Sequence, residues 1–333
     1  MIPRVAVIGL GHWGPNLARN FAALGSLGAI CDADGARLSE IATRHPKARA
    51  LLDFDAVLQD PSIDAVAIAT PAATHGALVR RALEAGKHTL VEKPLCLDLD
   101  EGRDLANLAK ARGRVLMIGH LLLYHRAYLA MRARIEDGAI GPIRYLYCNR
   151  LSLGKIRREE NALWSFAPHD ISMILGLVGG LPERVLTSGG SYLRPDVADT
   201  TLSHLTFDGG IQAHVFVSWL HPYKEHRMVV VGSDGMIVFD DSQTGPGKLQ
   251  RFGHGVEWQG DIPHVTRADA EPLHYEAREP LAEECEHFLD CIRHGIPPRS
   301  NAEEALRVLA VLDACQRSLL SGSPTNIEID SKK

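Results

Sequence analysis

Short apolar runs alternate with stretches of helical periodicity up to residue 118, and this alternation restricts the fold more than any other feature of the sequence. Runs such as VAVI and AVAIA are rich in β-branched residues, which is typical of strands buried on both faces of a parallel sheet. Strands are expected at residues 5–8, 27–31, 65–69, 88–91 and 115–118. Helices are expected at residues 15–24, 35–44, 75–85 and 99–112. The pattern predicts a doubly wound α/β domain with a parallel sheet.

Beyond residue 122 the rhythm changes to strand-like segments with hairpin turns. A helix at 124–137, a strand at 143–151 and a helix at 169–177 are expected first. Further strands are expected at 184–189, 200–207, 211–219, 227–231 and 236–240, and residues 242–272 are expected to form a long loop. Two helices, 276–294 and 302–320, close the chain. We therefore predict a first domain over residues 1–121. A second α/β domain over 122–333 has a large open, mostly antiparallel sheet, and the last helices pack back on the first domain.

Composition excludes several classes of protein. The chain has 333 residues, of which 45% are hydrophobic and 23% charged, as in an ordinary globular protein of two domains. Its formal net charge of −5 argues against a nucleic-acid partner held by general electrostatics. The most apolar stretch, residues 116–124, is interrupted by Gly119 and His120 and is far shorter than the ~20 residues of a membrane span. The first expected strand begins almost at Met1, so we expect no signal peptide and a soluble, cytoplasmic protein.

The cysteines and histidines do not predict a metal site. The six cysteines are scattered without a CxxC pair, which indicates reduced and mostly buried thiols. The sixteen histidines include no HxH or HExxH motif. His120 and His125 stand five apart, which is a poor register for one helical face. We expect no metal.

The segment GLGHWG follows the first expected strand and opens the first expected helix, as a dinucleotide-binding fingerprint requires. Asp32, at the end of the second strand, would accept hydrogen bonds from a ribose diol and repel a 2′-phosphate, which favours NAD over NADP. Because Arg37 lies nearby, NADP stays open as a minor alternative. The residues predicted to bind the cofactor from these segments are Gly9, Gly11, His12, Trp13, Gly14, Asp32 and Arg37.

Two further segments end strands at the same carboxyl edge of the sheet, where ligands of open parallel sheets bind. Thr70 and Pro71 end the 65–69 strand, with His75 just beyond, and all three are predicted to line the cofactor site. Glu92 and Lys93, followed by a proline, end the next strand. From there Lys93 can reach a bound nicotinamide and a substrate hydroxyl. The alternative is a surface ion pair between the two adjacent residues.

GLGHWG, ATPAATH and VEKP, in this order and spacing, resemble the Gfo/Idh/MocA oxidoreductase family, which includes glucose–fructose oxidoreductase and inositol dehydrogenase. The resemblance implies that Lys93 and His169 are catalytic and contact the substrate. His169 stands where the family has a histidine, but Ser165 replaces the aspartate that usually precedes it by four residues. Asp170 is a poor substitute because adjacent helical residues point to different sides. We assign His169 as general base and Lys93 as its electrostatic partner, with the reverse assignment open.

A cationic cluster precedes the expected 169–177 helix. Lys155, Arg157 and Arg158 suit an anionic substrate such as a diphosphate, or form a solvated face balanced by neighbouring glutamates. The segments LGHWGPNLARNF, RLSLGKI and LWSFAPHDIS resemble nucleotide-sugar 3-dehydrogenases of the family. That resemblance implies oxidation of UDP-N-acetylglucosamine, or its uronate, to a 3-keto sugar. A 3-aminotransferase would then use the product in amino-sugar and lipopolysaccharide (lipid A) biosynthesis. The substrate-binding residues would include Tyr124, Lys155, Arg157 and Asn161.

Three alternatives stay open: an inositol-type polyol dehydrogenase, an NAD-dependent glycoside hydrolase, and a catalytically silent cofactor-binding sensor. The strands expected at 200–207 and 211–219 alternate apolar and polar residues, which indicates a sheet with one face on helices and the other free. Such a face tends to pair with its own copy. We therefore expect a homodimer or homotetramer.

Overall fold

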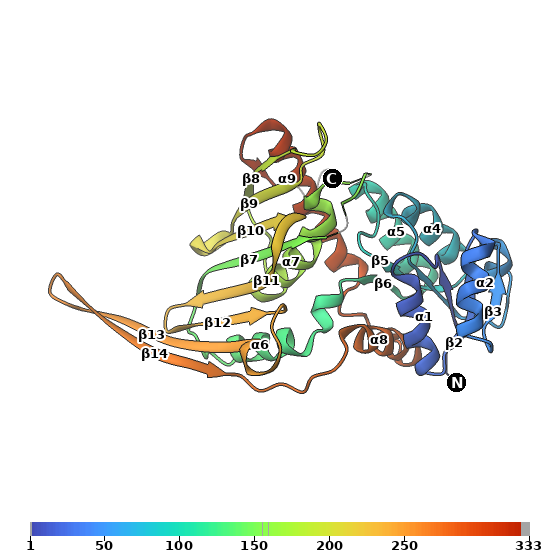
Figure 1. The fold of residues 1–333 in the computed structure, drawn as a ribbon, viewed down its shortest axis with the longest axis horizontal. Helices are drawn as coiled ribbons and strands as arrows, with labels where there is room; N and C mark the ends of the chain where they lie inside the picture. The colour runs from blue at the N-terminus through green and yellow to red at the C-terminus, as the bar shows by residue number, and fades with distance from the viewer. Residues whose placement is uncertain (1, 155, 159, 328–333) are drawn as a thin grey trace. The chain divides into compact units, whose positions relative to one another are not determined.

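The chain divides into two compact units, each of which is built from two stretches of sequence. The computed structural model describes residues 2–154, 156–158 and 160–327. The first unit contains Met1–Tyr124 and Arg278–Leu309, and the second contains His125–Ala277 and Ala310–Lys333. Figure 1 labels their helices and strands.

The first unit contains a six-stranded parallel sheet, which confirms the predicted doubly wound fold. Its strand order is β3-β2-β1-β4-β5-β6. The strands are β1 (Val5–Ile8), β2 (Leu27–Cys31), β3 (Arg49–Leu51), β4 (Ala65–Ile68), β5 (His88–Glu92) and β6 (Leu116–Gly119). β1 and β4 are buried at every position, as their continuous apolar sequences predict. The short edge strand β3 was not predicted, because three residues with two exposed give no periodicity to detect.

Helices pack around this sheet and are fixed by local caps. They are α1 (Gly14–Ala23), α2 (Gly35–Arg44), α3 (Phe54–Leu58), α4 (His75–Glu84), α5 (Leu99–Arg112) and α8 (Pro280–His294), with the short turns η1 (Ala72–Thr74) and η2 (Leu121–Tyr124). The Asp34 carboxylate caps α2, and Gly113 ends α5 with a φ of 61°. α8 packs on α1, where the Phe21 and Phe288 ring centroids lie 6.4 Å apart. α3 was not predicted.

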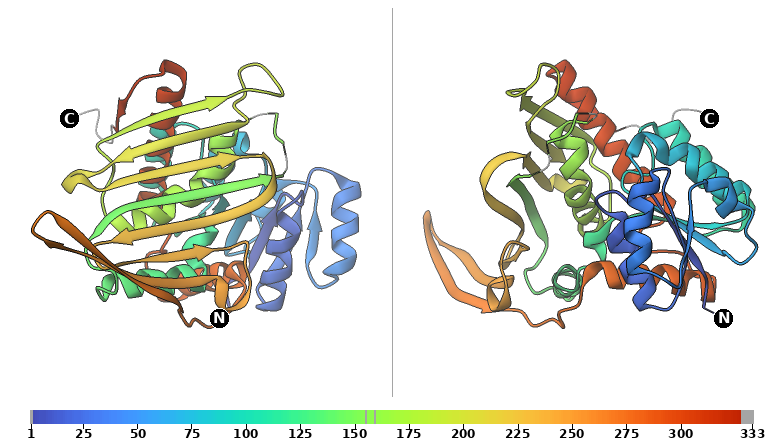
Figure 2. Two further views of the ribbon diagram at one scale, coloured as in Figure 1. Left: turned by 60° about the vertical axis from the view of Figure 1, so that its left-hand side comes forward. Right: turned by 45° about the vertical axis from the view of Figure 1, so that its right-hand side comes forward.

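The second unit contains a nine-stranded sheet in the order β14-β13-β12-β11-β7-β10-β9-β8-β15 (Figure 2). Only the β7–β10 pair is parallel among the strands described, which confirms the mostly antiparallel sheet. The strands are β7 (Ile143–Leu153), β8 (Arg184–Gly190), β9 (Thr200–Thr206), β10 (Gln212–Ser218), β11 (Leu220–Gly232), β12 (Gly235–Asp240), β13 (Leu249–Gln259), β14 (Ile262–Pro272) and β15 (Thr325–Asn326).

Helices cover one face of this sheet, and the opposite face carries exposed side chains. On one face, α7 (Ala162–Val178) packs against β7, β9 and β10, and α6 (Arg126–Glu136) packs against β12. Leu146 and Cys148 of β7 point to this covered face and are fully buried. The opposite face carries Tyr145, Leu186 and Leu202, whose exposed fractions are 45%, 43% and 45%. The remaining elements are α9 (Ala302–Ser321) and the short turns η3 (Asp208–Gly210) and η4 (Gly245–Gly247).

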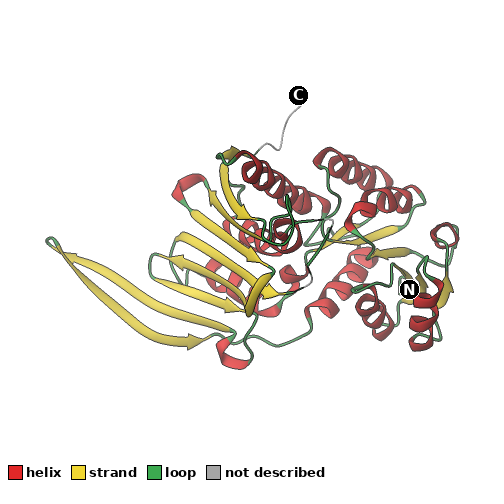
Figure 3. Cartoon of the chain, turned by 45° about the horizontal axis from the view of Figure 1, so that its top comes forward, coloured by secondary structure: helices red, strands yellow, loops and turns green. Residues whose placement is uncertain are grey.

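The expected loop over residues 242–272 is wrong, because β13 and β14 form a long hairpin there (Figure 3). Every residue of β14 is exposed, so its sequence lacks the alternation of buried and exposed positions that marks a strand. The start of the expected 169–177 helix is also wrong. α7 begins at Ala162 and runs through Pro168, because the Asn161 side chain caps its first turn and its apolar residues are buried.

Candidate active site

The carboxyl ends of β1, β2, β4 and β5 bring most of the predicted cofactor residues to one edge of the first unit's sheet. The strands are parallel, so the turns that follow them lie at the same edge. β1 leads to the glycine turn, β2 to Asp32, β4 to Thr70 and β5 to Lys93. This is the place where ligands of open α/β sheets bind.

The glycine turn requires glycine at two of its three positions. Gly9 has a φ of 85°, and a Cβ atom there would lie 2.8 Å from Cγ2 of Thr70. A Cβ atom at Gly14 would lie 1.9 Å from the Gly9 carbonyl oxygen. At Gly11, by contrast, no described atom lies within 4 Å of a Cβ position. Gly9 and Gly14 therefore fix the turn, while Gly11 faces open space that a pyrophosphate can occupy.

The amino terminus of α1 directs its backbone N–H groups to the same place. Trp13 is the N-cap residue, and no side chain among the described residues caps this helix end. Pro15 occupies the first turn, where a missing N–H costs no helical hydrogen bond. His12 is exposed next to the turn. Uncapped N–H groups at a helix N-terminus bind anions such as phosphates.

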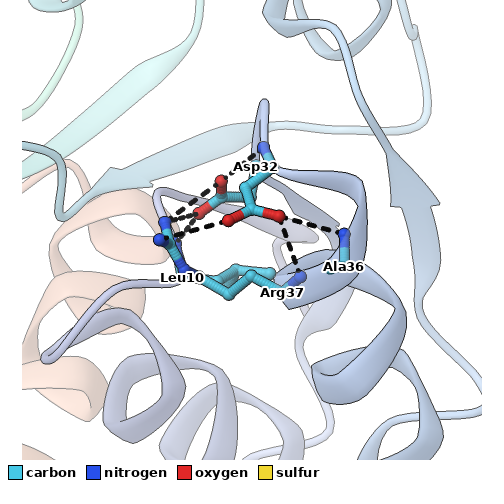
Figure 4. A network of polar contacts seen from close by, with 5 residues as sticks. Leu10, Asp32, Ala36 and Arg37 are labelled. Carbon is cyan, nitrogen blue, oxygen red and sulfur yellow. Dashed lines mark hydrogen bonds and ion pairs between the residues drawn. The ribbon is translucent and has the colours of Figure 1, made fainter.

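The Asp32 carboxylate is held at the end of β2 by backbone groups and by one arginine (Figure 4). Its Oδ2 accepts a hydrogen bond of 2.6 Å from the Leu10 N–H, and its Oδ1 accepts one of 2.8 Å from the Asp34 N–H. Arg37 Nη1 lies 3.3 Å from Asp32 Oδ2, and Arg37 Nη2 lies 3.4 Å from Asp34 Oδ2. A carboxylate has about four lone-pair positions, and Arg37 Nη1 also donates to both oxygens, at 3.3 and 3.4 Å, so two ribose hydroxyls would bind Asp32 in place of Arg37.

His75 links the turns that follow β4 and β5. Its Nδ1 lies 2.7 Å from the Pro94 carbonyl oxygen, and its Nε2 lies 2.9 Å from the Thr70 carbonyl oxygen. The ring is buried, with 1% of the residue exposed. The Lys93–Pro94 peptide bond is cis. This packing gives His75 a role in holding the two turns in place, so we do not include it among the residues proposed to touch the cofactor.

The carboxyl groups of Glu92 and Glu284 interact close to Lys93, and no local motif of the sequence indicates this pairing. Burial raises the pKa of Glu92 to about 7, against the opposing effects of the Lys93 charge and of the polar groups of Lys93 and Trp13 nearby. Glu284, on α8, is 1% exposed, and burial together with the Glu92 charge raises its pKa well above the usual value. Among the described residues, no hydrogen-bond partner reaches its Oε1. Two carboxyl groups this close disfavour the doubly charged form of the pair.

In the second unit, α7 carries the proposed base. His169 is partly exposed, and Ser165 is buried one turn earlier on the same helix. Asp170 points to the core, where Arg150 of β7 donates hydrogen bonds of 2.8 and 2.9 Å to its two oxygens. Asp170 is therefore engaged elsewhere and does not replace the aspartate that Ser165 displaces, as the sequence indicated.

The predicted substrate-binding residues differ in what their side chains contact. Arg157 is partly exposed, and its Nε lies 2.9 Å from Glu160 Oε1, while Lys155 lies outside the described residues. Asn161 caps α7, and its Nδ2 donates a 2.9 Å hydrogen bond to Gln316. Tyr124 is 1% exposed, and its hydroxyl lies 2.9 Å from Ser300 Oγ. The side chains of Asn161 and Tyr124 thus have structural partners, and we leave both out of the proposed substrate site.

No group of three or more potential ligand side chains in the described ranges could hold a metal ion. Nor does any helix described here have the length and apolar character needed to cross a bilayer.

The glycine turn, the uncapped α1 terminus and Asp32 together fit the pyrophosphate and adenosine ribose of NAD. Lys93 and Glu92, at the end of β5, would lie toward its nicotinamide end.

Comparisons with known proteins agree with this arrangement. Residues 3–120 match the model of an oxidoreductase family with an NAD-binding Rossmann fold, and residues 128–238 match the GFO/IDH/MocA C-terminal domain. UDP-N-acetylglucosamine 3-dehydrogenase of Acidithiobacillus ferrooxidans is 31% identical over 92% of this chain and 94% of its own. A solved structure of that enzyme has a TM-score of 0.84 at 30% identity, covering 96% of this chain and 99% of the other.

A second relative, the NAD-dependent scyllo-inositol 2-dehydrogenase of Bacillus subtilis, is 28% identical over 98% of this chain and 96% of its own. Both relatives span the two units, so the similarity is not confined to the nucleotide-binding fold. The sequence fingerprint, the strand order and the two family matches lead to one conclusion. The chain belongs to the Gfo/Idh/MocA family of NAD-dependent oxidoreductases.

Proposed function

We propose that this protein oxidises the C3 hydroxyl of a UDP-N-acetyl sugar, with UDP-N-acetylglucosamine favoured, to the 3-keto sugar. The observation that carries the proposal is the similarity to a UDP-N-acetylglucosamine 3-dehydrogenase over 92% of this chain, at 31% identity. The cationic segment that leads into α7 supports it, because a diphosphate needs positive charge close to the groups that react.

The proposed chemistry assigns one role to each of two side chains. Bound NAD supplies the acceptor, at its nicotinamide C4, for the hydride that leaves C3. His169 accepts the hydroxyl proton, since imidazole has a pKa near the working pH. The Lys93 ammonium orients the hydroxyl and stabilises the negative charge that develops on its oxygen. Hydride and proton together account for the two hydrogens lost when the alcohol becomes a ketone.

Arg157 and Arg158 are the described residues proposed to bind the diphosphate. Arg157 already holds a carboxylate, that of Glu160, at 2.9 Å. A guanidinium in that position can exchange a carboxylate for a phosphate, because both present two oxygens to its planar fork. A 3-aminotransferase would then transfer an amino group to the new ketone, as in amino-sugar and lipopolysaccharide biosynthesis. We place the protein in the cytoplasm, in line with six free, buried cysteines.

Polyol oxidation of the inositol type is the second candidate, and the 28% identity to a scyllo-inositol 2-dehydrogenase favours it. The two candidates differ in whether the substrate has a diphosphate. Steady-state NADH formation with UDP-N-acetylglucosamine, compared with myo- and scyllo-inositol, separates them. Nucleotide-sugar oxidation is expected to be uphill near neutral pH, so the assay includes a 3-aminotransferase that removes the ketone.

The variant Arg157→Ala tests at a single side chain whether the substrate has a diphosphate. We expect the KM for the nucleotide sugar to rise ~10-fold or more while NAD affinity stays unchanged, since only the diphosphate loses a partner. Arg132→Ala is the matched control, because Arg132 also forms an ion pair with a glutamate close in sequence, at 2.7 Å to Glu136, but lies on α6. Equal KM values for the two variants would argue against the diphosphate site. Oxidation of inositol but not of the nucleotide sugar would reject the proposed function.

A further inference from the structure

Glu284 of α8 is a buried titratable residue that the proposed chemistry does not use. It is 1% exposed, and no described residue forms a hydrogen bond with its Oε1. Its buried neighbours on the same helix, Leu281, Cys285 and Phe288, supply no compensating charge. A carboxylate in such surroundings is costly, so the neutral acid is favoured. Burial accordingly raises the pKa of Glu284 well above its usual value.

Glu92 lies at the carboxyl edge of the parallel sheet, in space that a glycine leaves open. It is the last residue of β5 and pairs with Gly119 of β6 (Figure 1). A Cβ atom at Gly119 would lie 3.0 and 3.2 Å from the two carboxyl oxygens of Glu92. The carboxyl group therefore packs against the β6 backbone. Burial raises the pKa of Glu92 to about 7, so this group titrates near neutral pH.

Glu92 and Glu284, here called the carboxyl pair, interact within the first unit. The Glu92 charge raises the pKa of Glu284 further, beyond the effect of burial. Neighbouring groups of like charge disfavour the doubly ionised state. The pair therefore loses its two protons in separate steps, the first of them near neutral pH.

Two cations, Lys93 and His120, face the carboxyl pair. The positive charge of each lowers the pKa of Glu92. His120 follows β6, is 2% exposed, and has its Nδ1 2.6 Å from Glu304 Oε2 of α9. A charge on His120 is thus balanced by Glu304, and the carboxyl pair is left to respond to other charges.

Other groups around the pair keep a constant charge near neutral pH. Burial moves the pKa of three groups away from this range and leaves them neutral: Tyr124 of η2, and Cys285 and His287 of α8. Arg299 keeps its charge, with its guanidinium 4.8 Å from the centre of the Tyr124 ring. The remaining charges on α8 and on α1, which packs against it, form ion pairs: Arg19 with Glu279, and Arg278 with Glu283.

We propose that the carboxyl pair holds a proton whose binding depends on the charge of the nicotinamide ring. β5 and β6 belong to the half of the sheet that serves the nicotinamide side of a dinucleotide, opposite the half that carries Asp32. Binding of NAD⁺ brings a cationic ring to this half and favours the ionised pair, so one O–H bond breaks and its proton passes to solvent. In the complex with NADH the ring is neutral, and the pair regains that proton from solvent.

This proton is separate from the hydroxyl proton that His169 is proposed to accept. The proposal rests on the NAD site and not on the identity of the sugar. Proton uptake by the pair stabilises the reduced complex relative to the oxidised complex, and more so at lower pH. This direction assists an alcohol oxidation that is expected to be uphill near neutral pH.

The expected size of the effect follows from Coulomb's law. A unit charge about 10 Å from a carboxyl group, at an effective dielectric constant of about 20, lowers its pKa by about one. For a group with a pKa of about 7, this change releases about 0.4 proton near pH 7. The affinity for NAD⁺ relative to NADH should then rise about fivefold between about pH 6 and 8.

Isothermal titration calorimetry of the full-length protein, without sugar, measures the protons exchanged on binding. Titrations of NAD⁺ and of NADH are repeated in buffers of different ionisation enthalpy, and the slope of the apparent enthalpy gives the proton number. Both cofactors have the same phosphates, so groups that respond to the phosphates cancel in the comparison. We expect NAD⁺ to release about 0.4 proton more than NADH near pH 7. Equal proton numbers would overturn the proposal.

Substitution of both carboxyl groups tests whether the pair is the source of the proton. The double variant Glu92→Gln, Glu284→Gln keeps the shape of both side chains, and its proton numbers for the two cofactors should agree within about 0.1. Glu286→Gln is the matched control, because Glu286 lies on the same helix in a solvent-accessible ion pair with Arg278. This control should keep the wild-type difference. A difference that persists in the double variant would assign the proton to another group and contradict the proposal.

Infrared difference spectra of the wild type provide the test if the double variant does not fold or does not bind the cofactor. A protonated carboxyl group has a C=O band that is separate from the carboxylate bands and shifts in heavy water. We expect NAD⁺ binding to weaken this band and NADH binding to leave it unchanged. A band that NAD⁺ does not change would also reject the proposal. No sugar takes part in these measurements, so their failure would leave the proposed sugar oxidation standing.

Discussion

Asp32→Ala is expected to remove the preference for NADH over NADPH. The Asp32 carboxylate is fixed by the Leu10 N–H at 2.6 Å and the Asp34 N–H at 2.8 Å, so its remaining lone pairs are already oriented. Hydrogen bonds to a charged group contribute about 1.5–3 kcal/mol each. Because the diol would displace Arg37 from the carboxylate, we take about 2–3 kcal/mol net for its two hydroxyls together, so NADH should bind about 30- to 150-fold more weakly to the variant.

NADPH should respond in the opposite direction. Removing Asp32 takes away the negative charge that repels a 2′-phosphate. It also releases Arg37, whose Nη1 lies 3.3 Å from Asp32 Oδ2, to pair with that phosphate. A gain of about tenfold is a modest value for one exposed guanidinium, so the ratio of the two dissociation constants should change by at least about 100-fold.

Fluorescence titration of the two reduced cofactors measures this ratio directly. Asp34→Ala is the matched control, since Asp34 also pairs with Arg37, at 3.4 Å, and caps α2. That variant should lose about 1 kcal/mol of stability but keep the cofactor ratio within about threefold. Asp32→Asn retains an acceptor for the Leu10 N–H and separates loss of charge from loss of the turn. Equal affinities of the wild type for NADH and NADPH, or an unchanged ratio in Asp32→Ala, would refute the reasoning.

The remaining predictions concern catalysis and pH. Lys93→Ala and His169→Ala should each lower kcat by ~10² or more with NADH affinity retained in the same titration, and near-normal turnover of His169→Ala would exclude it as the base. Ser165→Asp should move the acid limb of the pH–rate profile upward if the new carboxylate raises the basicity of His169, whereas an unmoved limb would show that the two do not interact. The Glu92–Glu284 pair should make the folded protein bind more protons than the unfolded chain between about pH 4.5 and 7, because burial raises the pKa of Glu92 to about 7. The free energy of unfolding in urea should therefore fall as pH rises through this window, and Glu284→Gln should flatten the slope; a slope equal to that of the wild type would contradict the coupling.

The sequence predicted the parts whose signal is local. The β-branched runs of β1 and β4 are buried at every position, and the glycine turn needs glycine for reasons confined to a few neighbouring residues. Its partners Asp32 and Lys93 end strands of a parallel sheet, so strand order alone brings them to one edge. The assignments of these side chains to cofactor and catalysis stay predictions.

Features without a local signal were missed or misjudged. β14 and the last four residues of β13 are exposed on both faces, so they lack the burial pattern that marks strands. The expected helix start at residue 169 is wrong, because α7 begins seven residues earlier at Ala162, where Asn161 caps it. Glu92 and Glu284 lie far apart in sequence, and their interaction depends on how α8 packs in the first unit. Likewise, the partners of Tyr124 and Asn161, Ser300 and Gln316, are distant in sequence.

Transfer of deuterium from a labelled substrate tests the central claim most directly. UDP-N-acetylglucosamine carrying deuterium only at C3 is incubated with the protein and NAD, with an aminotransferase to remove the ketone, and the mass of the reduced cofactor is measured. The account predicts one deuterium in each NADH formed, with unlabelled NADH from substrate deuterated at C4 instead. Unlabelled NADH from the C3-deuterated sugar, or no NADH from either sugar while scyllo-inositol is oxidised, would contradict it.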